Sequence, residues 1–346
     1  MSGGDGHEDG HEDGQEDGHD DGWYGALGRP AFFALPPEAS HRLAMQLLAI
    51  PLPWERIGGA VHDPSLEVDL GGIRLPNPIG LAAGFDKACR HLDSLGRLGF
   101  GHVVGGTVTR APRTGNPRPR IVRDRARRAI VNSMGLPNPG ADRAAANLRR
   151  SPRTAPRLAS VADEDRDAAI GTVERLAPHV DGIELNASSP NAPWSHDPGH
   201  VGELLAAFRT VTERPLLVKL PPFKGREDGE TMLTFARRAV DAGAAALVCS
   251  NTVAVEEDRL AGGRGGLSGG PLTPLTPQIV AEVAAATGRS VPIVACGGIF
   301  TAEDVRASLD AGATAIQLYT GLIYRGPGIV GDLLRGLVEG GPSASA

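Results

Sequence analysis

From about residue 66 the chain alternates short apolar runs with amphipathic segments, and no other feature constrains its fold so tightly. The apolar runs occupy residues 78–84, 102–108, 156–162, 182–188, 215–221, 246–251, 292–298 and 315–321. Helical patterns fall between most of them, among others at 201–211, 231–243, 277–288 and 302–312. Eight strands that alternate with helices predict an α/β fold, specifically a (β/α)8 TIM barrel. A doubly wound open sheet is the alternative, but no GxGxxG motif follows the first strand.

Charge and composition narrow the classes of ligand. Aromatic residues make up only 4% of the chain, which gives base stacking little to work with, so we expect no nucleic-acid partner. Residues 1–22 contain nine acids and no Lys or Arg, and removing these nine negative charges from the net charge of −6 leaves +3 for the remainder. A nearly neutral, slightly basic domain suits small anionic ligands.

Cysteine usage points to a reducing compartment, and hydropathy indicates no membrane-spanning segment. The three cysteines, Cys89, Cys249 and Cys296, lie far apart and outside any CxxC pattern. We therefore expect neither a disulfide framework nor a metal site, and a reducing cytosol fits. The chain has no apolar run of about 18 residues, so we expect no membrane-spanning helix. Its acidic N-terminus also differs from a secretory signal, which is basic and then apolar.

Three regions follow from these patterns. Residues 1–22 repeat a HEDG-like unit that buries no apolar surface, which predicts a disordered acidic, histidine-rich tail. This composition suits weak divalent-metal binding at most, and a solvated tail is the simpler interpretation. Residues 23–57 form a small apolar helical module with a helix over 36–50, ended by Pro51 and Pro53. The module either packs on the main domain or lies in a membrane interface, and residues 58–346 form the barrel.

Polar residues follow the predicted strands at their C-terminal ends, where parallel barrels carry their chemistry. The clearest case is GIELNASSPN at 182–191, an apolar strand that ends in amides and hydroxyls. The alternative is a strand exit that merely caps the next helix. We expect the following candidates to converge on one face: Lys87, Thr107, Asn132, Asn186, Ser189, Asn191, Lys219, Ser250, Asn251, Thr252, Gly269, Gly297, Gly298, Tyr319 and Thr320.

Glycine pairs and hydroxyls follow the last two predicted strands. Gly297 and Gly298 precede one helical pattern, and Tyr319 and Thr320 stand at the corresponding place after the final strand. Backbone N–H groups and helix starts at such places bind phosphate, so we expect a phosphate site here. A simple tight turn at the glycine pair is the alternative.

Two lysines, Lys87 and Lys219, accompany apolar strands. An unpaired buried ammonium is costly, so an anion must compensate each one. Internal pairs with Asp86 or Glu184 are one interpretation. The other is a substrate carboxylate or an anionic reduced flavin, because a cation near a flavin ring tunes its electronics.

Seven ordered segments together resemble dihydroorotate dehydrogenases, specifically the quinone-linked class 2 enzymes, and the similarity runs over residues 27–337. The segments are NPIGLAAGFDK (77–87), GFGHVVGGTVTRAPRTGNPRPR (99–120), VNSMGLPNPGAD (131–142), LNASSPN (185–191), SNT (250–252), GGLSGGPL (265–272) and QLYTGLIYRGPG (317–328). The stretch RPAFFALPPEASHRLA (29–44) is similar to the N-terminal quinone-tunnel helices of class 2. Class 1 members lack that module and have a cysteine where Ser189 stands.

The resemblance implies oxidation of (S)-dihydroorotate to orotate in pyrimidine (UMP) biosynthesis, with FMN as hydride acceptor and a quinone as electron acceptor. It implies a monomer in peripheral contact with the cytoplasmic side of the cell membrane, or a cytoplasmic protein. Ser189 would be the catalytic base that removes a proton from C5 of the substrate, and Lys87 would neutralise the substrate carboxylate.

The resemblance also assigns binding residues. Those for the substrate would be Lys87, Asn132, Ser133, Met134, Gly135, Leu136, Asn186, Asn191, Asn251 and Thr252. Those for FMN would be Ala83, Gly84, Thr107, Ser160, Asn186, Lys219, Ser250, Gly269, Gly298, Tyr319 and Thr320. His41 and Arg123 would belong to the quinone tunnel; the alternative for each is an ordinary surface charge.

The chain departs from the family pattern at several positions. Ser160 stands where the family has Asn, and residues 162–164 replace a Gly-x-x-Lys stretch. Ala192 stands where the family has a Thr of its proton relay, and the loop 193–200 also differs. Two alternatives therefore stay open: a paralogous FMN-dependent oxidoreductase acting on another small carboxylate or ring, or a non-catalytic ligand-binding barrel.

Overall fold

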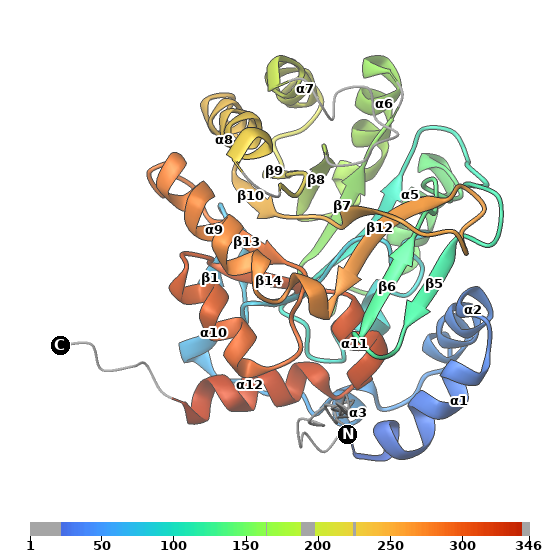
Figure 1. The fold of residues 1–346 in the computed structure, drawn as a ribbon. Helices are drawn as coiled ribbons and strands as arrows, with labels where there is room; N and C mark the ends of the chain where they lie inside the picture. The colour runs from blue at the N-terminus through green and yellow to red at the C-terminus, as the bar shows by residue number, and fades with distance from the viewer. Residues whose placement is uncertain (1–21, 164, 188–197, 224–225, 341–346) are drawn as a thin grey trace, which may run out of the picture.

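Eight parallel strands close into a barrel at the centre of the molecule, in the order β10-β13-β14-β3-β4-β7-β8-β9 (Figure 1). The structure is a computed structural model that describes residues 22–163, 165–187, 198–223 and 226–340. The barrel strands are β3 (Ile79–Leu81), β4 (His102–Val108), β7 (Arg157–Val161), β8 (Gly182–Asn186), β9 (Leu216–Lys219), β10 (Ala246–Cys249), β13 (Ile293–Cys296) and β14 (Ala315–Leu318). Each predicted apolar run supplies one strand, in chain order, so the prediction of a (β/α)8 barrel is confirmed.

Helices follow the barrel strands and pack around the outside of the barrel (Figure 1). They are α4 (Leu92–Gly96), α5 (Ala141–Arg150), α6 (Arg166–Leu176), α7 (Pro198–Arg209), α8 (Arg226–Asp241), α9 (Leu275–Ala286), α10 (Ala302–Asp310), α11 (Thr320–Arg325) and α12 (Ile329–Glu339). Short 3₁₀ turns are η2 (Pro64–Leu66), η3 (Ala177–His179) and η5 (Gly270–Leu272). The four helical patterns named in the sequence analysis correspond to α7, α8, α9 and α10, with ends displaced by a few residues.

Side chains alternate between the inside and the outside of the barrel, because successive residues of a strand point to opposite faces. Ile183 and Leu185 of β8, for example, pack in the large core beneath the outer helices. Leu217 and Val248 belong instead to a separate cluster inside the barrel. The inward positions nearest the C-terminal ends of the strands carry Ser160, Asn186, Lys219, Ser250, Cys296 and Tyr319. The strand register therefore delivers polar side chains to one end of the barrel.

The opposite end of the barrel is closed by a hairpin. Its strands are β1 (Val68–Asp69) and β2 (Arg74–Leu75). Leu70 and Leu75 are fully buried and pack with Leu217 in the cluster inside the barrel. Apolar packing thus fills this end, and it leaves the C-terminal end as the place where a ligand can enter.

Two insertions form a second, antiparallel sheet that the sequence analysis did not predict. Its strands, in the order β11-β12-β6-β5, are β5 (Ile121–Asp124), β6 (Ala129–Asn132), β11 (Val253–Glu256) and β12 (Arg264–Gly269). The pair β5–β6 follows β4, and the pair β11–β12 follows β10. Figure 1 shows β5, β6 and β12 side by side, although they come from distant parts of the chain. Because both insertions leave from the C-terminal ends of barrel strands, this sheet stands over that end of the barrel.

The N-terminal residues fold into short helices, of which α1 and α2 lie beside β5 (Figure 1). They are the π-helix η1 (Tyr24–Gly28), α1 (Arg29–Ala34), α2 (Pro37–Leu48) and α3 (Trp54–Gly58). The predicted helix over 36–50 corresponds to α2. The Arg123 guanidinium of β5 donates to the carbonyl oxygen of Leu35 at 3.0 Å. The Tyr24 hydroxyl donates to the carbonyl oxygen of Ile323 at 2.8 Å. The helices are therefore fastened to both the antiparallel sheet and α11.

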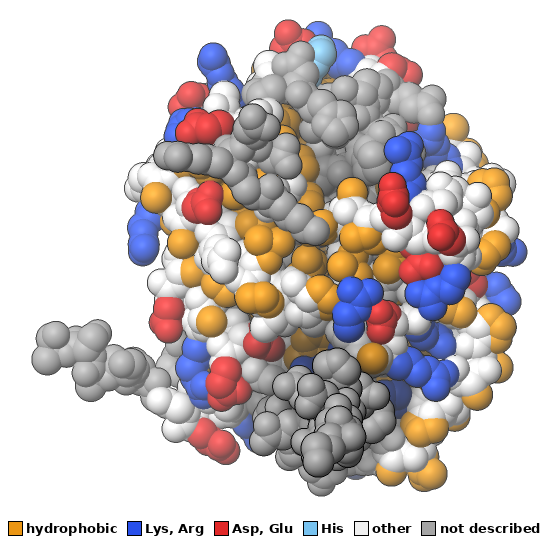
Figure 2. Space-filling model, viewed as in Figure 1, with side chains coloured by type: hydrophobic (Ala, Val, Ile, Leu, Met, Phe, Trp, Pro, Cys, Tyr) orange, Lys and Arg blue, Asp and Glu red, His pale blue; other side chains and the backbone are white. Residues whose placement is uncertain are grey.

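These N-terminal helices also expose apolar side chains. Leu27 of η1 is 73% and Leu43 of α2 is 38% exposed, and hydrophobic side chains appear along the edge of the molecule formed by α1 and α2 (Figure 2). No helix within the described ranges is long and apolar enough to cross a bilayer. The predicted tail, residues 1–22, lies outside the described residues except for Gly22.

One layer of the barrel interior is polar although it is sealed from solvent. His102, Glu184 and Gln317 are all fully buried. The His102 ring lies over Gly80, where an added Cβ would stand only 2.1 Å from a ring atom. Burial lowers the pKa of His102 from its ordinary 6.5 to about 4. The folded protein therefore holds this imidazole neutral at a pH where the unfolded chain would protonate it.

We expect this histidine to make the fold sensitive to mild acid. Above pH 6.5 it is neutral in both states, and its contribution to stability is intact. As the pH falls from 6.5 towards 4, the unfolded chain binds a proton that the folded chain excludes, so stability falls by roughly 3 kcal/mol. The replacement His102→Gln should reduce the drop in Tm between pH 7 and pH 4.5, measured by thermal melts.

The matched control is His62→Gln, which replaces an exposed histidine. This variant should follow the wild-type pH dependence. Equal drops in Tm for His102→Gln and the wild type would contradict the assignment of the acid sensitivity to the barrel interior.

Candidate active site

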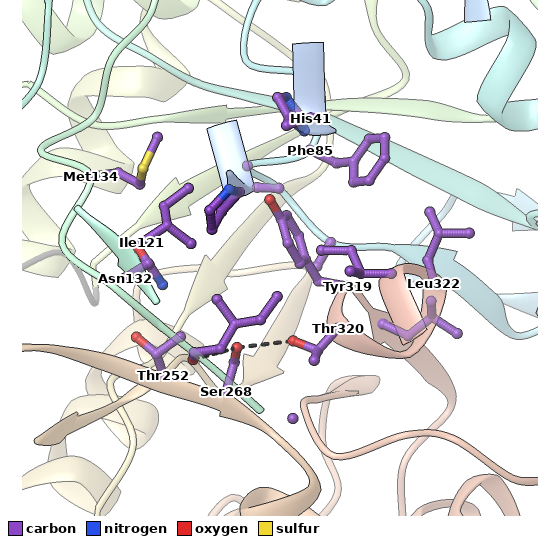
Figure 3. A pocket seen from close by; sticks show the side chains of 18 of the residues that line it. His41, Phe85, Ile121, Asn132, Met134, Thr252, Ser268, Tyr319, Thr320 and Leu322 are labelled. Atoms are coloured by element: carbon purple, nitrogen blue, oxygen red, sulfur yellow. Dashed lines mark hydrogen bonds between the residues drawn. The ribbon is translucent and has the colours of Figure 1, made fainter. Parts of the chain in front are cut away.

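A cavity of about 1510 Å³ opens at the C-terminal end of the barrel strands. Three parts of the chain line it: the ends and loops of the barrel strands, the antiparallel sheet, and the N-terminal helices. Figure 3 shows side chains from all three parts turned towards one another, among them His41, Asn132 and Tyr319. Pockets for one small ligand usually measure about 300–1,000 Å³, so this cavity has room for more than one ligand.

The inner end of the cavity is built from inward side chains of neighbouring strands. Asn186 of β8 is paired with Lys219 of β9 in the strand register, so both point into the barrel. The Asn186 amide donates to Thr107 Oγ1 at 3.0 Å, and Thr107 Oγ1 lies 3.1 Å from Ser160 Oγ. All four side chains are buried. An ammonium, an amide and two hydroxyls thus meet at the bottom of the cavity.

Among the residues that the structure describes, no carboxylate is a direct hydrogen-bond partner of either cavity lysine. Lys87 donates to the carbonyl oxygen of Gly84, and Lys219 Nζ lies 3.4 Å from Cys296 Sγ. Asp86 accepts instead from the backbone N–H groups of Ala88 at 3.2 Å and of His91 at 2.6 Å. The direct Lys–carboxylate pairs considered from the sequence are therefore not formed, and both ammonium groups can receive an anion.

The two lysines differ in electrostatics. Burial lowers the pKa of Lys87 to about 8, and the nearby Arg120 guanidinium contributes to the shift. Burial also acts to lower the pKa of Lys219, but the Cys296 and Glu184 side chains outweigh it and raise the pKa above its usual value. Lys87 is therefore the lysine that can lose its charge in mildly alkaline solution.

Aromatic rings form a path from the barrel to the N-terminal helices. Tyr319 and Phe85 lie edge to face with centroids 5.7 Å apart, and Phe85 lies edge to face with His41 of α2 at 5.3 Å (Figure 3). Burial raises the pKa of Tyr319 to about 12. Burial, together with the charge of Lys87, lowers the pKa of His41 to about 4. All three rings are uncharged at neutral pH, so this wall suits an apolar ligand.

The outer rim comes partly from the antiparallel sheet. Asn132 ends β6, and its amide lies 3.4 Å from the carbonyl oxygen of Gly266. Ser268 of β12 and Thr320 of α11 share a hydrogen bond of 2.9 Å (Figure 3). The expectation that the candidates sit at barrel strand ends is thus wrong for Asn132 and Gly269, which belong to β6 and β12. They reach the same cavity because the inserted sheet stands over it.

The glycine pair after β13 lines the cavity, but the helix that follows does not offer a free N-terminus. Asp304 accepts from the N–H groups of Phe300 at 2.8 Å and Thr301 at 2.9 Å, and Thr301 caps the helix in return. The Gly298 carbonyl oxygen accepts from Thr273 Oγ1 at 2.6 Å. A phosphate here would depend on the glycine loop and the start of α11, because α10 satisfies its own first turn.

Most of the predicted site residues meet in this one cavity. Those that line it are His41, Ala83, Gly84, Lys87, Thr107, Arg123, Asn132, Ser133, Met134, Gly135, Leu136, Asn186, Lys219, Asn251, Thr252, Gly269, Gly297, Gly298, Tyr319 and Thr320. Ser160 and Ser250 are buried at the inner strand ends next to it. Ser189 and Asn191, including the predicted catalytic base, lie outside the described residues.

The sequence analysis missed a charged cluster at the mouth. Glu38 of α2 accepts from Arg120 Nε at 2.9 Å and from Arg118 Nε at 2.9 Å. Partial burial raises the pKa of Glu38, but hydrogen bonds from the two arginines outweigh this and lower it overall. Arg120 also donates to the carbonyl oxygens of Thr114 at 2.8 Å and Asn116 at 3.1 Å. No local pattern could pair Glu38 with residues about 80 positions away.

Comparison with known proteins gives consistent matches. The family model for dihydroorotate dehydrogenase matches residues 65–340. A dihydroorotate dehydrogenase (quinone) of Erythrobacter litoralis is 38% identical over 328 residues and covers 90% of this chain and 94% of that relative. One of Verminephrobacter eiseniae is 36% identical over 342 residues, with 90% of this chain and 94% of the relative covered.

Solved structures agree with these relatives. A ligand-free DHODH from Eimeria tenella has a TM-score of 0.77 and 30% identity and covers 88% of this chain and 96% of its own. The same organism's DHODH in complex with ferulenol has a TM-score of 0.78 and 28% identity, with 88% of this chain and 91% of the other covered.

We expect the Glu38 cluster to stabilise the docking of α2. The replacement Glu38→Gln removes the negative charge that two arginines share, and hydrogen bonds to charged groups contribute about 1.5–3 kcal/mol each. Because Glu38 is only partly buried, solvent screening should reduce the net loss to about 1–2 kcal/mol. Urea denaturation would detect this as a lower midpoint.

A matched control is Glu55→Gln, which breaks the more exposed ion pair with Arg97, 3.3 Å long. Exposed pairs contribute about 0–1 kcal/mol, so its midpoint should stay close to the wild type. Equal midpoints for all three proteins would show that the cluster does not hold α2.

Proposed function

The chain belongs to the dihydroorotate dehydrogenase family, and on that premise we propose that it oxidises (S)-dihydroorotate to orotate in pyrimidine biosynthesis, with FMN as cofactor and a quinone as electron acceptor. The observation that carries this proposal is the continuous cavity between the inner barrel side chains and the N-terminal helices. A cofactor, a substrate and an apolar acceptor can share this cavity. The proposed reaction requires this, because the cofactor takes electrons from the substrate and then passes them to the acceptor. Relatives named as quinone-linked enzymes support the same activity.

The residues at the inner end fit a flavin. The Lys219 ammonium, the Asn186 amide and the Thr107 hydroxyl offer hydrogen-bond donors to the polar edge of a planar ring, and they lie in a buried site. When bound, FMN supplies hydride acceptance and onward electron transfer. The proposed FMN-binding residues are Ala83, Gly84, Thr107, Ser160, Asn186, Lys219, Ser250, Gly269, Gly298, Tyr319 and Thr320.

The substrate would lie beside the rim, with Lys87 opposite its carboxylate. Within the described part of the chain, the hydrogen-bond partner of Lys87 is a backbone carbonyl, that of Gly84, so its ammonium charge is available to a bound anion. Amide side chains suit the ring carbonyl and N–H groups of a pyrimidine. The proposed substrate-binding residues are Lys87, Asn132, Ser133, Met134, Gly135, Leu136, Asn186, Asn191, Asn251 and Thr252.

Ser189 would take the proton from C5 of dihydroorotate while the hydride leaves C6, which together give orotate. A serine hydroxyl is a weak base at its ordinary pKa, so burial and a neighbouring relay must activate it. Ala192 stands in place of the family's relay Thr, and this departure favours a slower proton removal. The same departure supports the second candidate, an FMN-dependent oxidoreductase acting on another small carboxylate or ring.

Residues 23–57 would form the quinone and membrane module. Its apolar exposed edge and the uncharged rings of His41 and Phe85 support an apolar acceptor that arrives from this side. Arg123 lines the same region, but its guanidinium donates to Leu35 and lies 4.5 Å over the Phe33 ring. We propose a peripheral attachment of a monomer to the cytoplasmic side of the cell membrane.

Anaerobic mixing of the purified FMN-containing protein with dihydroorotate should bleach its visible absorption, and a quinone should restore it. The replacement Ser189→Ala should leave the colour and slow the bleaching at least about 100-fold, as expected for loss of a general base. Ser188→Ala is the matched control, and its rate should stay near the wild type. Rapid bleaching of Ser189→Ala would exclude this serine as the base, and a coloured wild type that never bleaches would favour another substrate.

Lys87 should set the affinity for the substrate carboxylate. The replacement Lys87→Met should raise KM for dihydroorotate roughly 10- to 100-fold, because a charged hydrogen bond is lost. Since burial places the pKa of Lys87 at about 8, wild-type kcat/KM should fall as the pH rises through 8, and the variant should lack this limb. Steady-state kinetics from pH 6 to 9 check both points.

The matched control for that series is Arg90→Met, which removes an exposed cation three positions along the chain. Its KM should match the wild type. An unchanged KM in Lys87→Met would assign this lysine a structural role.

A further inference from the structure

A buried polar layer of His102, Glu184 and Gln317, which the proposed reaction does not use, lies at the inner end of the cavity: Gln317 lines the cavity, and His102 and Glu184 lie beneath it. Gln317 Nε2 lies 3.4 Å from Glu184 Oε2 and 3.4 Å from His102 Nε2. Within the described residues, Glu184 Oε1 has no hydrogen-bond partner, and the same holds for Gln317 Oε1 and His102 Nδ1. A carboxylate so poorly satisfied in a sealed interior is costly. Some compensating charge must lie close to it.

The strand register makes Lys219 the candidate for that charge. β8 and β9 pair Asn186 with Lys219 and Glu184 with Leu217. Paired positions of neighbouring strands face the same side, so Glu184 and Lys219 both point into the barrel. Two residues along a strand span about 7 Å. Glu184 therefore lies one layer deeper than Lys219, on the side away from the cavity.

Cys296, the other neighbour of Lys219, carries no charge to compete with Glu184. Burial raises the pKa of this thiol above its usual 9.0 despite the nearby ammonium. The thiol is therefore protonated at neutral pH. Of the two side chains that raise the pKa of Lys219, Glu184 is the one that carries a carboxyl group.

We propose that Glu184 is a positioning residue that offsets the charge of Lys219 and thereby lowers the electron affinity of the flavin bound above it. The role rests on the flavin site proposed above. A cation beside the ring favours added negative charge, and a carboxylate behind the cation opposes it. Because Lys219 lies nearer the ring, the local field stays positive but is weaker than a lone ammonium would produce.

Removing the carboxylate charge should make the flavin easier to reduce. Glu184 would lie about one layer of side chains further from the flavin ring than Lys219. At an effective dielectric constant of about 20, removing one charge at such a distance changes the equilibrium constant for flavin reduction at least about tenfold. For a two-electron couple this corresponds to a midpoint potential about 30 mV more positive. Loss of the Lys219 charge would shift the midpoint potential in the opposite direction, to a more negative value.

The test compares four variants of the FMN-containing full chain at pH 7, by equilibrium titration against a reference dye of known potential. Glu184→Gln and Glu184→Met remove the charge with side chains of similar length, and both should raise the midpoint potential by about 30 mV. Glu184→Asp keeps the charge and should stay near the wild type. Glu174→Gln removes a charge from the exposed face of α6 and should leave the potential unchanged.

A change in packing or hydrogen bonding would shift the amide and thioether variants by different amounts, and that outcome would overturn the proposal. An unchanged or more negative potential in both neutral variants would overturn it as well. These outcomes concern Glu184 alone, since they require a coloured protein. A wild type that takes up no flavin would instead refute the flavin site, and this role together with it.

Discussion

Closing eight parallel strands into a ring forces every second side chain into one narrow interior. The rest of the structure depends on this constraint, because it decides which polar groups share the buried space. In β8 and β9 the register sets Asn186 beside Lys219 and puts Glu184 one step deeper. The hairpin residues Leu70 and Leu75 close the other end with apolar packing. A ligand is therefore admitted only where the strand ends present ammonium, amide and hydroxyl groups.

The two lysines of the cavity have different charged neighbours, and these neighbours affect the pKa of each lysine. Lys87 lies near Arg120 and has a lowered pKa, whereas Lys219 is backed by a carboxylate and has a raised one. Two lysines in one cavity thus differ in how firmly they hold a proton. Lys219, with the raised pKa, faces the proposed cofactor, whose charge changes during turnover. Lys87, with the lowered pKa, faces the proposed substrate, whose carboxylate keeps the same charge during the reaction.

The barrel and most of its inner residues could be predicted from the sequence because the signals are local. Each strand is a short apolar run that ends in or is soon followed by a polar residue, as in GIELN, which ends in Asn186. The antiparallel sheet was missed because its strands are short, β12 (Arg264–Gly269) is poor in apolar residues, and β12 pairs with β6 across more than about 130 residues. The Glu38–Arg120 contact was missed for the same reason: only the folded chain brings its members together.

The loop that holds Arg120 also touches the rim of the cavity. Its carbonyl oxygen accepts from the N–H of Ser133 at 2.9 Å, and the N–H of Asn116 donates to the carbonyl oxygen of Met134 at 2.9 Å. Glu38 of α2 is therefore joined through Arg120 by a few hydrogen bonds to Ser133 and Met134, which are proposed to bind the substrate. A displacement of the N-terminal helices would therefore reach the rim of the cavity through this short chain of hydrogen bonds.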